Sequence, residues 1–544
     1  MIKLKETISG IYSKDLNKSY TTTGMKGQIQ EFAIGDVQNY TYTYDDYGRI
    51  SKITTPMGDF NYTRLANSDL ISQMTRPNGV TSSWNYEDKR NLLTQVQNGS
   101  VSDFGYTNNA IGNRTAMSRA GSAFSTPDTI CYSYNSRSEV IGAVSNQNSA
   151  YNYAYNFDPI GNRLTANLAG SSYNYTTNML NQYTVVNSNQ PTYDDDGNML
   201  TNGGWTYTWN GENRMVLAVN SNTKLQFAYD YMGHRIEKKV FDGDTVVSYK
   251  RFVYDNYKQV EELDALNSNS VLKRYSWQPE AVGLDVPLSM TDIATAKNYA
   301  YTLDANKNVS DLTDALGNVV AHYEYSPFGT HTATGSYTGN PFRFSSEVFD
   351  SETGLIYYNY RYYNPSLGRW INRDPIEEEG GWNLYGFVKN DAIVLYDLLG
   401  KRCCGEHVLS AGQKCCMNKY PYTPKKQCCK NNMLYNSDFL TCLTNCIERH
   451  SLSNLLGGLL AANSTINGLY SKPYKTGTTG KSTGWLSKLG GKIKVTLPFR
   501  FMNTNNLLRA IGRLGVAMLV ADGFYTSGLF LSCRAICVDD PCSF

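Results

Sequence analysis

The stretch YNFDPIGNRL at residues 155–164 shows the unit from which most of the chain is built. It reads as an aromatic residue, an Asp or Asn, a short run with Gly, an Asn or Arg, and then an apolar residue. Successive copies between residues 86 and 254 begin 14 to 26 residues apart. The clearest copies are YDDYGRI at 44–50, YTNNAIGNR at 106–114, YDDDGNML at 193–200, YTWNGENRMV at 207–216 and YDYMGHRI at 229–236. A recurring unit of this length predicts a repeat architecture.

Each unit predicts a β-hairpin, because an aromatic residue ends one strand and an apolar residue begins the next. The Asp or Asn and the Gly between them supply a turn that needs positive φ. One hairpin cannot bury its apolar face alone, so neighbouring hairpins must pair into a continuous sheet. The 544 residues include 43 Tyr and 45 Gly beside only 16 Pro, which also favours β structure. We therefore predict a mainly β protein whose repeat tyrosines pack strands and take no part in catalysis.

The composition changes near residue 400. Residues 401–544 carry 18 Lys and Arg against 6 Asp and Glu, a net charge of +12, whereas residues 1–400 carry 32 against 42, a net charge of −10. The tail also holds eleven of the 12 cysteines. This asymmetry suggests that body and tail attract each other, or that the tail meets an anionic partner. Residues 1–20 lack the apolar core of a signal peptide, so we favour export by another route or a fragment of a longer protein.

The repeats resemble the YD repeats of the RHS (rearrangement hotspot) family, and the resemblance runs over roughly residues 40–400. In that family the repeats coil into a large hollow β shell that encloses a variable C-terminal polypeptide, often a toxin. The resemblance implies a repeat shell at residues 1–325 and an RHS-associated core at 326–400 that plugs the shell. It also implies a variable C-terminal effector domain at 401–544, for which the sequence predicts a small, mainly α, cysteine-rich fold.

Within the core, GLIYYNYRYYNPSLGRWINRDP and GGWNLYGFVKND are similar to the family pattern. In members that cut themselves, one arginine and two aspartates inside the shell release the C-terminal cargo. The family spacing of these three residues falls here on Arg361, Asp374 and Asp397, and the expected cut lies near residues 400–402. Such chemistry fits an aspartic-type peptidase, in which one carboxyl keeps its proton while the other activates water. The guanidinium would hold a carboxylate or stabilise charge on the carbonyl oxygen.

Two departures bear on this expectation. Leu398 stands where proline is usual, and Lys401 stands where an apolar residue is common. Either change could move the scissile bond relative to the aspartates and slow the cleavage. The alternative is structural: Arg361 pairs with a carboxylate to hold the core strands, while Asp374 and Asp397 serve turns.

The cysteines of the tail predict a disulfide framework formed after export. They include no C-x2-C pair, and only His407 and His450 could add imidazole ligands, so we predict no zinc site and no cofactor. TCLTNC and SCRAIC each place two cysteines four residues apart on an expected helix. One pairing hypothesis joins Cys442 to Cys537 and Cys446 to Cys533. The eleven tail cysteines are Cys403, Cys404, Cys415, Cys416, Cys428, Cys429, Cys442, Cys446, Cys533, Cys537 and Cys542.

Two apolar segments of the tail, residues 452–470 and 514–533, leave two interpretations open. The second segment is 20 residues long, which suits a membrane-active hairpin, although Asp522 lies at its middle. The other interpretation is a pair of ordinary helices packed in a small disulfide-linked domain. The tail lacks an H-N-H motif and a metal-binding carboxylate cluster, which argues against a metal-dependent nuclease. A basic nucleic-acid binder stays open, although we do not expect nucleic acid as a partner.

Together these features predict a secreted or cell-surface protein of RHS type that stores a C-terminal toxin and cuts it free for use against competitor or host cells. Its expected partners are its own tail as cargo, an immunity protein, a delivery machinery and a membrane target. The alternative is a non-enzymatic surface or adhesion protein whose repeats bind carbohydrate or partner proteins.

Overall fold

The computed structural model describes residues 2–8, 14–21, 27–35, 38–279, 282, 285–397 and 399–400 of the body of the chain. Beyond residue 402 it describes only short strands between residues 403 and 436. The contacts divide the chain into two compact units, Met1–Arg402 and Cys403–Phe544. The second unit contributes the strand pairs β36 (Cys403–Cys404) with β37 (His407–Val408), β38 (Lys414–Cys416) with β39 (Tyr420–Tyr422), and β40 (Gln427–Lys430) with β41 (Met433–Asn436).

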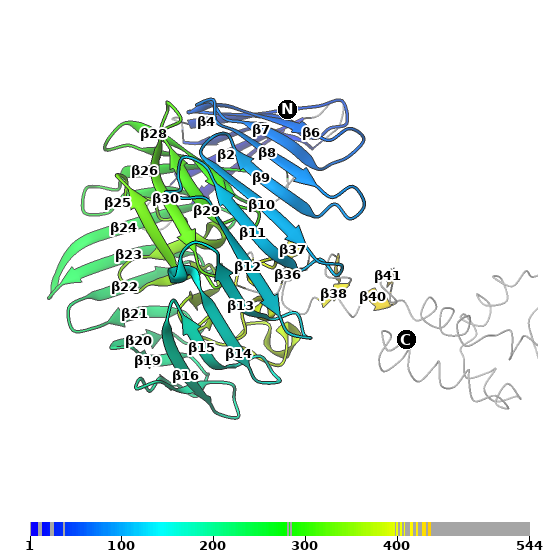
Figure 1. Cartoon of the computed structure of the whole chain (residues 1–544). Helices are drawn as coiled ribbons and strands as arrows, with labels where there is room; N and C mark the ends of the chain where they lie inside the picture. Colours follow the sequence, from blue (N-terminus) through cyan, green and yellow to red (C-terminus); the bar gives the residue numbers. More distant parts are fainter. Residues whose placement is uncertain are drawn as a thin grey trace, which may run out of the picture. The chain divides into compact units, whose positions relative to one another are not determined.

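The first unit begins with a 17-stranded sheet in which each strand pairs antiparallel with the next strand in sequence (Figure 1). Its strands are β1 (Ile2–Ile8), β2 (Lys14–Tyr20), β3 (Ile29–Ile34), β4 (Gln38–Tyr44), β5 (Ile50–Thr55), β6 (Gly58–Arg64), β7 (Ile71–Thr75), β8 (Thr81–Tyr86), β9 (Leu93–Asn98), β10 (Ser102–Asn108), β11 (Arg114–Ala120), β12 (Asp128–Tyr134), β13 (Val140–Ser145), β14 (Tyr153–Phe157), β15 (Arg163–Leu168), β16 (Ser171–Thr177) and β17 (Tyr183–Val186). The short 3-10 helix η1 (Ser149–Tyr151) lies between β13 and β14.

A 14-stranded sheet follows, with the same pairing of each strand to the next. Its strands are β18 (Thr192–Tyr193), β19 (Met199–Asn202), β20 (Trp205–Trp209), β21 (Met215–Val219), β22 (Lys224–Tyr229), β23 (Arg235–Asp242), β24 (Thr245–Asp255), β25 (Lys258–Asp264), β26 (Ser270–Trp277), β27 (Pro287–Asp292), β28 (Lys297–Leu303), β29 (Val309–Thr313), β30 (Val319–Tyr325) and β31 (His331–Gly335).

A small four-stranded sheet completes the first unit. It consists of β32 (Val348–Asp350), β33 (Leu355–Tyr358), β34 (Arg361–Asn364) and β35 (Arg369–Trp370), and the 3-10 helices η3 (Phe344–Ser346), η4 (Glu377–Gly380) and η5 (Val388–Asn390) lie beside it in sequence.

The repeat unit forms the hairpin that its sequence predicts. In the turn between β14 and β15, Asp158 Oδ1 accepts hydrogen bonds from the amides of Ile160 at 3.0 Å and Asn162 at 2.8 Å. Gly161 has φ +92°, a value that suits glycine. The same pair of bonds recurs at Asp45, Asn109, Asp230 and Asp314. The prediction of a mainly β protein built from repeat hairpins is thus confirmed.

The two long sheets bury side chains against each other. Leu16, Phe32 and Tyr40 of the first sheet share one cluster with Val253 and Leu263 of the second. The hydroxyl of Tyr40 also donates to the carbonyl oxygen of Tyr275 at 3.3 Å. Strands more than 200 residues apart in sequence therefore form one core.

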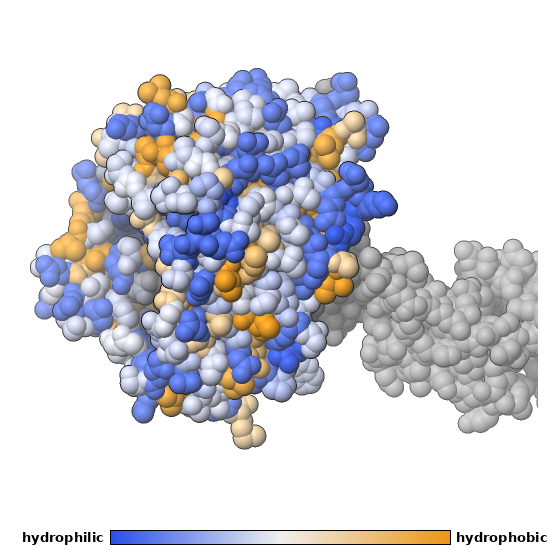
Figure 2. Space-filling view, viewed as in Figure 1, coloured by the Kyte–Doolittle hydropathy of each residue, from blue (hydrophilic) through white to orange (hydrophobic). Residues whose placement is uncertain are grey.

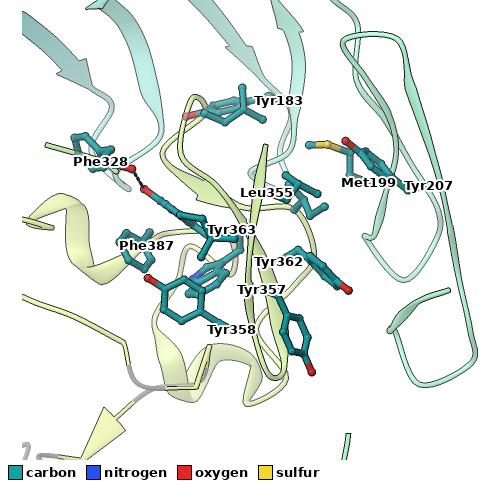
Figure 3. Close-up of a cluster of buried hydrophobic side chains, with 14 of the residues drawn as sticks. Tyr183, Met199, Tyr207, Phe328, Leu355, Tyr357, Tyr358, Tyr362, Tyr363 and Phe387 are labelled. Atoms are coloured by element: carbon teal, nitrogen blue, oxygen red, sulfur yellow. Dashed lines mark hydrogen bonds between the residues drawn. The ribbon is translucent and has the colours of Figure 1, made fainter. Parts of the chain in front are cut away.

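The small sheet lies within the largest cluster of buried side chains, which takes members from both long sheets. Cross-strand partners Tyr357 and Tyr362 lie on one side of the hairpin, and Tyr358 and Tyr363 lie on the other (Figure 3). This alternation is the two-residue period of a strand. The Tyr363 hydroxyl donates to the carbonyl oxygen of Phe328 at 2.8 Å, which ties the hairpin to the turn after β30 (Figure 3).

The visible face of the first unit is mostly hydrophilic, with scattered hydrophobic side chains (Figure 2). Large exposed hydrophobic residues sit in the repeat turns, as at Tyr47, Ile111, Met179 and Tyr231. No helix in the described part of the chain combines the length and the apolar composition that a membrane crossing requires. The apolar segments of the tail, its expected helices and the proposed cysteine pairs lie outside the described residues.

Candidate functional site

The hairpin β33–β34 places Arg361 at the centre of the site. Arg361 pairs across the hairpin with Tyr358, and only 2% of it is exposed. Its guanidinium carbon lies 4.0 Å from the ring centroid of Trp370. Stacking on the indole fixes the orientation of the buried guanidinium, so each of its nitrogen atoms faces a defined partner.

Asp374 contacts one end of this guanidinium. Its Oδ2 atom lies 2.9 Å from Arg361 Nη1, an ion pair that lacks the alignment of a hydrogen bond. Its Oδ1 atom accepts from the amide of Ile376 at 3.1 Å. A Cβ atom at Gly380 would lie 2.6 Å from Asp374 Oδ2, so glycine at that position leaves room for the carboxylate.

Asp397 contacts the other end. Its Oδ2 atom accepts from Arg361 Nη2 at 3.2 Å. Its Oδ1 atom accepts from the amides of Leu399 at 3.2 Å and Gly400 at 2.9 Å. Asp397 therefore bonds to the amides two and three residues further on, and the structure brings all three expected residues together.

The third nitrogen of the guanidinium meets the backbone at the expected cut. Arg361 Nε donates to the carbonyl oxygen of Gly400 at 2.6 Å. Gly400 has φ +72°, and a Cβ atom there would lie 2.8 Å from the carbonyl oxygen of Tyr358. The amide of Tyr360 donates to the carbonyl oxygen of Leu399 at 3.1 Å. The peptide at Gly400 is thus held against the β33–β34 turn, whereas residues 398, 401 and 402 lie outside the described residues.

Each aspartate meets its own nitrogen of Arg361. A guanidinium that donates to a carbonyl oxygen draws electron density from the carbonyl carbon. Carboxylates on either side could accept a proton from water. The three residues therefore offer the parts of a peptide hydrolysis, and equally a buried ion-pair network that holds the core.

Repeat arginines form a second group of contacts to the core that sequence reasoning missed. Arg114 donates to the carbonyl oxygen of Ile393 at 2.8 Å, Arg163 to that of Ser366 at 3.0 Å, and Arg235 to the carboxylate of Asp350 at 3.1 Å. The signal was present in the motif, since these arginines end the GNR and GHR steps of the repeat. Their side chains fasten the repeat turns to residues 350–393.

The contact between Arg235 and Asp350 is a buried ion pair that keeps the carboxyl group of Asp350 ionised. The carboxylate is buried and accepts from both Arg235 and Lys238. Burial favours the neutral acid, but the two cations outweigh burial and lower the pKa of Asp350 to about 2.

A further carboxyl, Glu347, lies near Asp397 and also escaped sequence reasoning. Burial raises the pKa of Glu347 well above its usual value, and the carboxylates of Asp285 and Asp397 raise it further. Lys307 opposes this shift, with its Nζ atom 3.9 Å from Glu347 Oε1. Among the residues that the structure describes, no group of three or more His, Cys, Asp or Glu side chains could hold a metal ion.

Comparison with known proteins places the chain in a family. The profile described as Teneurin YD-shell matches residues 119–393, just over half of the chain. The chain belongs to the teneurin YD-shell family. The match covers most of the repeats and nearly all of the core, and it confirms the predicted YD-repeat type.

Curated relatives of this YD-shell chain include toxins. The tRNA nuclease WapA of Bacillus subtilis is 31% identical over 257 residues, which cover 45% of this chain and 10% of WapA. The double-stranded DNA deaminase toxin A of Burkholderia cenocepacia is 29% identical, over 41% of this chain and 18% of that protein. The matched region thus spans less than a fifth of each of these relatives.

Solved structures show the same fold. The Tc holotoxin pore of Photorhabdus luminescens with TccC3 aligns with 71% of this YD-shell chain and 21% of that chain, at a TM-score of 0.60 and 18% identity. A crystal structure of TcdB2-TccC3 aligns with 72% and 22%, also at a TM-score of 0.60 and 18% identity. The long antiparallel sheets therefore match the shell of a Tc toxin.

Proposed function

We propose that this YD-shell protein encloses its C-terminal segment as a toxin or effector and releases it by cutting the peptide bond after Gly400. The observation that carries the proposal is the 2.6 Å hydrogen bond from Arg361 Nε to the Gly400 carbonyl oxygen. The same guanidinium holds Asp374 and Asp397, so the polarised carbonyl and both carboxylates share one buried centre.

The cleavage proceeds by addition of water to the Gly400 carbonyl carbon. One aspartate accepts a proton from the water as the C–O bond forms, and Arg361 stabilises the negative charge on the carbonyl oxygen. The C–N bond to Lys401 then breaks, and the leaving nitrogen takes a proton from the protonated carboxyl group. The products are a carboxylic acid on Gly400 and an amine on Lys401, and transfer of the acid's proton to the amine leaves a carboxylate and an ammonium group. Neither a metal nor a cofactor enters the reaction.

In this proposal residues 1–325 build the hollow wall, residues 326–400 form the plug with the cleavage site, and residues 401–544 are the variable effector. The arginine contacts between repeat turns and core support the plug. The tRNA nuclease WapA and the double-stranded DNA deaminase toxin A share this region, which supports a toxin role for the tail. The net charge of +12 on the tail against −10 on the body favours their association.

The pairing of TcdB2 with TccC3 supports a delivery machinery as partner and a secreted or delivered protein. An immunity protein, which would protect the producing cell, follows from the toxin role. A membrane target remains a proposal from the apolar segments of the tail.

A denaturing gel of the expressed full chain tests the proposal. We expect two bands of about 45 and about 16 kDa from the 60.9 kDa chain. Asp374→Asn and Asp397→Asn should each give one full-length band, while the exposed Asp69→Asn, as a control, should still give two. A single full-length band in the parent chain would contradict self-cleavage and favour the non-enzymatic surface protein that binds carbohydrate or protein partners.

A further inference from the structure

The turn between β28 and β29, residues 304–308, carries a lysine in left-handed backbone, because Lys307 has φ +55°. The same place holds glycine in some repeat turns, as at Gly161 and Gly233, and Asn or Ser in others, as at Asn181, Asn213 and Ser138. Left-handed backbone is uncommon for lysine, because its Cβ crowds the neighbouring carbonyl oxygen. Lys307 is also only 2% exposed, although lysine is rarely buried. A buried cation in left-handed backbone suggests a function.

The ammonium group of Lys307 spans two carboxyl groups of different segments. Its Nζ atom lies 2.8 Å from Asp285 Oδ1 and 3.9 Å from Glu347 Oε1. It also lies 5.8 Å from the ring centroid of Tyr396, the neighbour of Asp397 in sequence. Lys307 therefore reaches from the long sheet towards the loop that carries an aspartate of the candidate site.

Polar contacts of the same turn reach two segments of the core. Ser346, which precedes Glu347 in sequence, donates from Oγ to the carbonyl oxygen of Lys307 at 2.6 Å. The side-chain amide of Asn306 donates to the carbonyl oxygen of Ala392 at 2.7 Å. The turn thus joins the segment that bears Glu347 to the loop that leads to Asp397.

We propose that Lys307 and Glu347 are positioning residues for the cleavage, and that they hold the loop 392–400 so that Asp397 and the Gly400 carbonyl meet Arg361. This inference rests on the proposed self-cleavage. It adds two residues that touch neither the scissile peptide nor Arg361, and that act through the placement of Asp397.

The charges around Glu347 support this role. Lys307 faces it, as do the carboxylates of Asp285 and Asp397, and burial together with these carboxylates raises its pKa. The hydroxyl of Tyr358 also lies near, and its own pKa is raised by burial and by Glu347. Glu347 in its neutral form adds no negative charge beside Asp397. Its ionisation at higher pH would repel Asp397, so cleavage should fall on the alkaline side of the raised pKa.

Cleavage rates of the full chain, measured against pH, test the two residues. Lys307→Met should slow cleavage by roughly tenfold or more, because small displacements of reacting groups cost rate steeply. Loss of the ammonium should also move the alkaline limb of the pH profile upwards, since Lys307 lowers the pKa of Glu347. Glu347→Gln keeps the shape of the neutral side chain. This variant should therefore cleave at neutral pH, and its cleavage rate should no longer fall at alkaline pH. Lys297→Met, at an exposed position of β28, is the matched control.

Hydrogen exchange at the amides of Leu399 and Gly400 gives a readout that needs no cleavage. In the uncleaved Asp374→Asn background, Lys307→Met should speed the exchange of both amides relative to Lys297→Met. Thermal unfolding identifies any variant that fails to fold. If Lys307→Met does not fold, the pH profile of Glu347→Gln alone tests the positioning role. Unchanged exchange and unchanged cleavage in folded Lys307→Met would overturn the positioning role. A parent that never cleaves would overturn self-cleavage, while faster exchange would still support positioning.

Discussion

Arg361 donates from Nε to the carbonyl oxygen of Gly400 at 2.6 Å, while its two other nitrogen atoms face Asp374 and Asp397. One side chain thus connects the expected point of cleavage to both expected acids. The contact joins residues 39 positions apart in sequence.

The first prediction concerns this arginine. Arg361→Lys keeps the charge but cannot fill all three contacts, so we expect cleavage to fall by at least about a hundredfold. Arg361→Gln should also unfold more readily, because two buried carboxylates lose their cation at a cost of about 3–5 kcal/mol. Gel densitometry over time and thermal unfolding measure the two effects. Cleavage by Arg361→Lys at the parental rate would contradict the role of the guanidinium fork.

A second prediction compares two glycines with the same left-handed backbone, of which only Gly400 has no room for a side chain. Gly400 has φ +72° and its added Cβ would meet Tyr358, whereas Gly354 has φ +70° and open space around it. Both alanine substitutions should lower the free energy of unfolding by about 1 kcal/mol, because alanine is strained in left-handed backbone. Only Gly400→Ala should displace the carbonyl and slow cleavage. Equal cleavage rates in Gly400→Ala and Gly354→Ala would argue against a fixed scissile peptide.

A third prediction concerns acid stability and the contact between repeats and core. The folded pKa of Asp350 is about 2, below its ordinary value of 3.8. A lowered carboxyl pKa stabilises the fold above pH 3.8, and this stabilisation disappears as the pH falls towards 2. Asp350→Asn should therefore lower the free energy of unfolding at pH 7 by about 3–5 kcal/mol, since buried Arg235 loses its carboxylate and Lys238 keeps only Glu352.

Chemical denaturation between pH 2 and 7 checks this expectation. The difference between Asp350→Asn and the parent should shrink as the pH approaches 2. Asp69→Asn serves as the control, because that carboxylate is 92% exposed and water screens its ion pair with Arg49. A difference that stays constant with pH would contradict the lowered pKa.

A fourth prediction concerns His322, whose Nδ1 lies 2.6 Å from Asp311 Oδ1. Burial opposes the charged ring, but Asp311 and Glu324 outweigh burial and raise the pKa of His322 to about 9. A raised histidine pKa stabilises the fold fully below about pH 6.5, and this contribution is lost as the pH rises through 9. His322→Gln should destabilise the protein at pH 6 and much less at pH 10. Titration of the ring by NMR gives the pKa directly, and a value near 6.5 would refute the charged pair.

The sequence predicts the hairpins well because their causes are local. An Asp or Asn and a Gly within five residues make the turn, and alternating aromatic residues make the strand. The meeting of Arg361, Asp374 and Asp397 was also predictable, although from family spacing and not from physical pattern. The meeting of Lys307 with Glu347 could not be predicted. These two residues and their neighbours Asp285 and Asp397 come from four separate segments of the sequence. Their contacts join segments far apart in sequence, which no local pattern encodes.

The pairing of each strand with its sequence neighbour has a consequence for timing. Contacts between adjacent strands close short loops, so such a ribbon can grow while the nascent chain leaves the ribosome. Arg361 and Gly400 follow the strands of both long sheets in sequence, so their contact forms only after those strands have been synthesised. Under the proposed cleavage, scission would therefore report that both sheets are complete.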